Sequence, residues 1–336
     1  MEGATEKMTL KKKSAFIIIL GLLLLASNVV PKNMAVNIQI NRQNIAKAVG
    51  VNVAVTTTTL ADFVGAIIGK EIEPIINPGT CPAHYDSEPG DIALVQDADI
   101  VFCHGFEGQW LDDLLTSVNK SSAKYPLGPL VAGAPWGVPA NAIKYIEVIT
   151  AKLNNTYAGL ASQFNTNLQT YTNQINAKAL ELQELAQNYS LLHKKAVVMI
   201  HQFGFTSFLG LDVVANWSKS DELMSVQEVA ALITEAAEAQ AEIVISNLQS
   251  GTNVGEEIAN DLGIPHAILT NFPQNDPEAA NYLSMLEYNL EQIRQAFSAT
   301  GNSANSALGL FVGLTSIIII APYFLHQEKR NKQKKH

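Results

Sequence analysis

The sequence predicts an α/β protein of two lobes, each with a parallel sheet flanked by helices, joined by one long spine helix. Short apolar strands alternate with helical stretches over residues 51–102, and the same alternation returns over residues 196–297. Between them, residues 141–192 contain helix formers and no strand signal. This alternation is typical of strand–helix–strand units with parallel strands. We therefore assign residues 50–140 and 195–300 to two lobes and residues 141–192 to the helical spine.

The elements of each lobe follow from β-rich runs and helical spacing of apolar residues. In the first lobe we predict a strand at 51–58, a helix at 60–68, a short apolar segment at 73–76, a helix at 91–98 and a strand at 99–102. In the second lobe we predict strands at 196–200, 242–246 and 267–270, and helices at 227–240, 254–262 and 281–297.

The spine is predicted from apolar residues that recur every three or four positions between Phe164 and Leu185. A single helix of about 28 residues would span about 42 Å at about 1.5 Å per residue, enough to run along both lobes. A coiled-coil hairpin is the alternative, but its heptad pattern is too brief to favour it.

Both ends of the chain carry membrane-type signals. Within residues 1–33, three consecutive lysines precede an apolar run at 15–30, which is the layout of an export signal that is either cleaved or retained as an anchor. Residues 307–325 carry no charge and precede a basic tail at 326–336, as expected of a transmembrane helix with a cytoplasmic end. We therefore expect a membrane-anchored protein whose body lies outside the cell.

Charge and missing motifs exclude several function classes. The net charge is −9, and without the ten basic and three acidic residues of the two ends the body carries −16. Such a body repels nucleic acid and attracts cations. The sequence has no glycine-rich phosphate loop, no G-x-S-x-G and no evident nucleophile–histidine pairing, so we do not expect an enzyme.

Five local patterns appear in an order that resembles one protein family, the solute-binding proteins of zinc, manganese and iron ABC transporters. The resemblance covers about residues 50–298. The patterns are GTCPAHYDSEPGD (79–91), ADIVFCHGFEGQWL (98–111), WGVPANA (136–142), IHQFGF (200–205) and YLSMLEYNL (282–290).

The resemblance implies capture of a divalent metal ion in a cleft between the lobes, for delivery to a permease in the membrane. It places His84 at or one residue past a ligand position, and His201 on a later one. His104 falls at the cleft end of a predicted strand. These three imidazoles, with one thiolate or water, would suit zinc or copper and would suit manganese poorly.

The two cysteines, Cys81 and Cys103, allow two interpretations. A disulfide is the first, since both are expected near adjacent strand ends in an oxidising compartment. Ligation of the metal is the second, and a disulfide would exclude it.

At other positions where the family is expected to have metal ligands, this chain carries residues that bind metal ions poorly. The expected ligands are replaced by Ala134, by Asn247, and by Thr270 or Asn271. The nearby carboxylate of Glu107 is interpreted as solvated surface. These departures support the alternative function, a metal-free binding, accessory or adhesion protein of a membrane complex that kept the fold and lost the site.

Overall fold

The computed structural model describes residues 50–131 and 136–299. The predicted export signal (15–30) and transmembrane helix (307–325) lie outside these residues. Within the described ranges, no helix combines the length and apolar character needed to cross a membrane.

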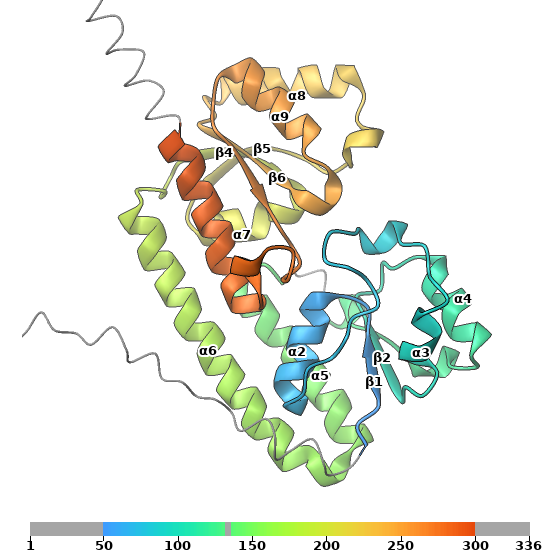
Figure 1. The fold of residues 1–336 in the computed structure, drawn as a ribbon. Helices are drawn as coiled ribbons and strands as arrows, with labels where there is room; N and C mark the ends of the chain where they lie inside the picture. The colour runs from blue at the N-terminus through green and yellow to red at the C-terminus, as the bar shows by residue number, and fades with distance from the viewer. Residues whose placement is uncertain (1–49, 132–135, 300–336) are drawn as a thin grey trace, which may run out of the picture. The chain divides into compact units, whose positions relative to one another are not determined.

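The first lobe is built on a three-stranded parallel sheet of order β1-β2-β3 (Figure 1). The third strand was not predicted, because its sequence, Lys-Tyr-Pro, has no apolar run. Residues 73–76 form no strand and contribute only a bridge between Pro74 and Val55. The elements are β1 Val53–Val55, α2 Thr58–Ile68, α3 Asp91–Val95, β2 Ile100–Cys103, α4 Gln109–Ser117 and β3 Lys124–Pro126.

The second lobe holds a four-stranded parallel sheet of order β5-β4-β6-β7. The three predicted strands are present, and an unpredicted strand, β5, forms one edge. The final helix occupies residues 282–299. The other elements are β4 Lys195–Met199, α7 Phe203–Phe208, β5 Asp212–Trp217, α8 Val226–Glu238, β6 Ile243–Asn247, α9 Asn253–Leu262 and β7 His266–Leu269.

The predicted spine is confirmed as α6, Ala161–Asn188, which follows α5, Pro139–Thr156 (Figure 1). Near its start, the Asn167 side chain donates to the carbonyl of Ile67 at the end of α2 (2.8 Å). Further along, Lys178 forms an ion pair with Glu287 of the final helix (3.0 Å). The spine therefore contacts both lobes.

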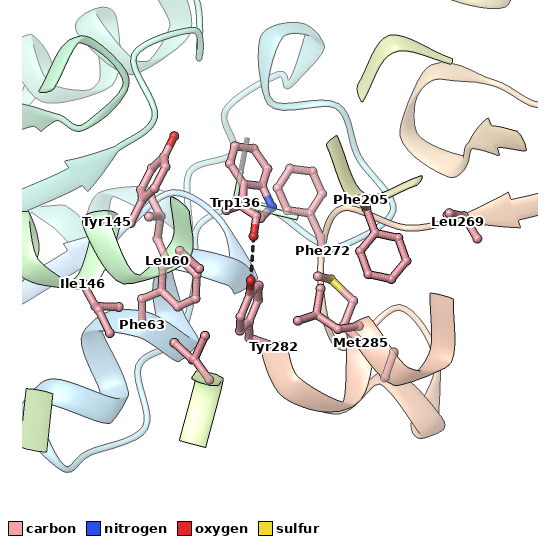
Figure 2. Packing of buried hydrophobic residues seen from close by; sticks show 14 of the residues in the cluster. Leu60, Phe63, Trp136, Tyr145, Ile146, Phe205, Leu269, Phe272, Tyr282 and Met285 are labelled. Carbon is pink, nitrogen blue, oxygen red and sulfur yellow. Dashed lines mark hydrogen bonds between the residues drawn. The ribbon is translucent and has the colours of Figure 1, made fainter. Parts of the chain in front are cut away.

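One apolar cluster is shared by the two lobes and the spine. Figure 2 shows its centre, where Phe63 of α2 lies beside Tyr282 of the final helix, with ring centroids 4.9 Å apart. The Tyr282 hydroxyl donates to the carbonyl of Trp136 (2.6 Å). Since burial of apolar surface is the main stabilising term in folding, this shared core holds the lobes together.

A close approach of helix to sheet in the second lobe requires a glycine. A Cβ added at Gly255 of α9 would lie 2.0 Å from Ser246 Oγ and 2.8 Å from His266 Nε2. Those two side chains are hydrogen-bonded to each other at 2.8 Å, so neither moves freely.

We predict that Gly255→Ala lowers the free energy of unfolding by about 1–3 kcal/mol, the usual cost of overpacking. Gly159→Ala is the matched control, because a Cβ there meets nothing within 4 Å. Urea unfolding measures both; equal stability of the two variants would contradict the close packing.

Candidate functional site

The candidate site lies where the parallel strands of both lobes end. His104 follows β2, the turn containing His201 follows β4, and Asn271 follows β7. In open α/β sheets, ligands bind at the carboxyl ends of the strands. The fold thus brings the family-like loops to the expected edges of the two sheets.

His104 is buried, with 1% of its surface exposed. Its Nε2 is 2.8 Å from the Thr57 hydroxyl, and its ring stacks on Trp136 with centroids 4.3 Å apart. Phe106 stacks at 5.2 Å. Burial lowers the pKa of His104 from 6.5 to about 4, so the ring is neutral at pH 7. Its Nδ1 has no hydrogen-bond partner in the described structure.

Glu107 is not solvated surface, as the sequence interpretation had it, but a buried structural carboxylate with 2% exposure. Its oxygens accept hydrogen bonds from the backbone N–H groups of His104 (2.5 Å) and Gly105 (2.6 Å) and from the Thr56 hydroxyl (2.8 Å). Because these donors are pre-organised, the buried charge is stabilised without a metal ion. The positive φ of Gly105 (104°) allows this tight loop.

The predicted disulfide is absent, because Cys81 and Cys103 are both free. Cys103 is the last residue of β2 and is fully buried in an apolar cluster, whereas Cys81 lies half-buried on the loop before His84. Burial, aided by the charge of Glu107, raises the pKa of the Cys103 thiol to about 12. Cys103 is therefore a protonated thiol at neutral pH and a poor metal ligand.

His84 is exposed at the end of a short helical turn, Pro82–His84. The loop is held by the Trp110 indole, which donates to the carbonyl of Pro82 (2.9 Å). Hydrogen bonds from the Ser220 hydroxyl and from its own backbone N–H lower the pKa of Glu222 in the second lobe, and His84 lowers it to a smaller extent. His84 is thus within electrostatic reach of the opposite lobe.

His201 is exposed in the turn Ile200–Gln202, directly after β4. Partial desolvation of the ring by the surrounding protein lowers its pKa. At neutral pH the imidazole is therefore uncharged and keeps a lone pair for a ligand.

Neutral groups occupy the remaining family positions. Asn271 Oδ1 accepts a hydrogen bond from the Gln202 side chain (2.9 Å), and the Asn271 carbonyl accepts one from the Trp136 indole (2.8 Å). Gln249 also forms a hydrogen bond with Asn271. Gln202 and Gln249 were not predicted from the sequence as site residues, because glutamine side chains belong to no metal-binding or catalytic motif. In the part of the chain that the structure describes, no three His, Cys, Asp or Glu residues lie close enough together to hold a metal ion.

The buried His104 predicts a specific pH dependence of stability. Its folded pKa lies below its unfolded value, so only the unfolded chain takes up a proton between about pH 6.5 and 4. As the pH falls through this range, proton uptake by the unfolded chain should lower the free energy of unfolding by up to about 3 kcal/mol. His104→Phe, which keeps a ring in the stack, should remove that component. Denaturant unfolding at pH 7 and 4.5 measures it; an unchanged pH difference in the variant would contradict the assignment.

Comparisons with known proteins point to one family. The family described as zinc-uptake complex component A, periplasmic, matches residues 53–296. The iron-binding protein YfeA of Yersinia pestis is 23% identical over 73% of this chain and 86% of its own length. The manganese ABC transporter substrate-binding lipoprotein PsaA of Streptococcus pneumoniae is 22% identical, over 73% and 88%.

Among solved structures, the Mn-bound periplasmic metal-binding protein from candidatus liberibacter asiaticus superimposes with a TM-score of 0.62. It is 16% identical and covers 72% of this chain and 98% of its own. That likeness establishes the two-lobed fold. With most of its length matched by the family pattern, the chain belongs to the zinc-uptake component A family of periplasmic solute-binding proteins.

Proposed function

We propose that this protein captures a divalent transition metal outside the cell and delivers it to the permease of an ABC transporter. Family membership over residues 53–296 is the observation that carries the proposal. Proteins of this family are substrate-binding components of transport systems, not enzymes. The relatives are named for iron and for manganese, so the metal must be argued from this chain's own side chains.

We assign the metal contacts to His84 and His201. Both side chains are exposed, and neither ring is buried in an aromatic stack. Both residues lie within sequence patterns that resemble those of the family. His104 is left out, because it is buried and its Nε2 is already bonded to the Thr57 hydroxyl. Cys81, three residues before His84, is the remaining soft donor. Two imidazoles with water favour zinc or copper over manganese, which prefers oxygen ligands.

Water would complete the coordination shell, and this limits the affinity. High-affinity zinc sites use three or four protein ligands, whereas two imidazoles supply about half of that set. We therefore expect affinity in the micromolar range or weaker. Such binding suits an ion that must be released again to a permease.

We further propose that the uncharged segment 307–325 tethers the protein, with the body facing outward. The support is the sequence alone: this segment is apolar and the tail at 326–336 is basic.

Zinc titration calorimetry at pH 7 tests the ligand assignment. We predict that His84→Ala and His201→Ala each weaken zinc binding at least tenfold, because each removes one of two imidazoles. His193→Ala is the control, since His193 is exposed and outside the site. Affinity should also fall as the pH drops and the imidazoles become protonated. Equal effects of all three variants would refute the assignment.

Asn271→Asp tests whether the ion lies near the end of β7. The change preserves size and leaves Oδ1 to accept from Gln202, but it adds a carboxylate beside the turn that carries His201. We predict at least tenfold tighter zinc binding in the same titration. Unchanged affinity in a variant with native stability would place the ion elsewhere.

A metal-free accessory or adhesion role is the second candidate. The observation that favours it is that no three potential ligands converge in the described residues and that amides occupy the family's carboxylate positions. Metal analysis of the protein purified from its own membranes separates the two. Absence of zinc and copper, together with no binding at millimolar concentration, would favour the metal-free role.

A further inference from the structure

The side-chain amide of Gln249 bridges the two lobes. It lies in the turn Leu248–Ser250 after β6. Its Nε2 donates to the carbonyl of Pro78 in the first lobe (2.9 Å) and to the Thr270 hydroxyl (2.9 Å). Its Oε1 accepts from the Asn247 amide (3.1 Å) and from the backbone N–H of Asn271 (3.1 Å). Both donors and both acceptor sites of this amide are therefore used.

Asn271 makes the second connection between the two lobes. Its carbonyl accepts hydrogen bonds from the Trp136 indole (2.8 Å) and from the Thr59 hydroxyl at the start of α2 (3.1 Å). Its side-chain oxygen accepts from Gln202 (2.9 Å). The segment after β7 is thus bonded to the first lobe directly and to Gln249 through its own N–H group.

These bonds join the lobes without any ionised group. Carboxylates at such half-buried positions would need a cation or a proton, because an unpaired buried charge is costly. Amides and hydroxyls satisfy one another and need neither. These contacts therefore form without a bound ion.

The apolar surroundings support the same arrangement. Trp136 stacks on Phe272, with ring centroids 5.8 Å apart, and also accepts the Tyr282 hydroxyl bond through its carbonyl. Figure 2 shows Trp136, Phe272 and Tyr282 grouped at this point. A displacement of the lobes would break the hydrogen bonds and expose these rings together.

We infer that Gln249 and Asn271 form a ligand-independent latch that keeps the lobes joined in the metal-free protein. The latch does not require that metal binds at all. If metal does bind, its capture proceeds without opening and closing of the lobes.

Exchange of the Trp136 indole N–H reports directly on the latch. The full chain in detergent, stripped of metal, is transferred to deuterated buffer, and the three tryptophan indole signals are followed by NMR. We expect the Trp136 indole to be protected, and Gln249→Ala to accelerate its exchange at least tenfold. The Trp110 indole, which donates to Pro82 within the first lobe, is the internal reference and should not change.

Two further variants complete the test. Gln183→Ala, on an exposed position of α6, is the matched control and should leave the Trp136 indole unchanged. Gln249→Glu keeps the side-chain size but removes both donors, so it should open the latch even if the alanine variant folds poorly. Fast exchange of the Trp136 indole in the metal-free natural protein, or no acceleration in a folded Gln249 variant, would overturn the inference.

Discussion

The packing of both lobes and the spine into one apolar core is the constraint on which the rest of the structure depends. Phe63, Trp136 and Tyr282 come from three distant segments and meet in this core. Because their burial fixes the lobes relative to each other, the loops at the strand ends are held at set positions. The polar groups between the lobes can then be uncharged amides and hydroxyls, because the lobes do not depend on a bound ion to hold them together.

This arrangement distinguishes His104 from the other two candidate histidines. His104 lies inside the aromatic stack, where burial keeps it uncharged and Thr57 binds its Nε2. His84 and His201 lie outside that stack and remain exposed. An imidazole buried against rings stabilises the interface, whereas an exposed imidazole on an anchored loop is available to an ion. The same residue type thus serves packing in one place and the proposed capture in another.

Much of the fold could be predicted from the sequence, because its signals are periodic. The spine was predicted at its observed length, and the apolar strands of both sheets were found. The strand at Lys124–Pro126 was missed, since register with β2 and not composition makes it a strand. The site was harder to predict. Spacing cannot reveal that Glu107 is buried under backbone donors, that the cysteines form no disulfide, or that Gln249 spans the lobes, because these depend on three-dimensional proximity.

Anomalous X-ray diffraction at the zinc edge, on crystals soaked with zinc, tests the central claim most directly. That claim is that the fixed lobes present His84 and His201 to a single ion. We predict one peak at about 2.0–2.1 Å from a nitrogen of each ring, with the bonds around Gln249 intact. A peak beside Cys103 and His104, or no peak at saturating zinc, would contradict it.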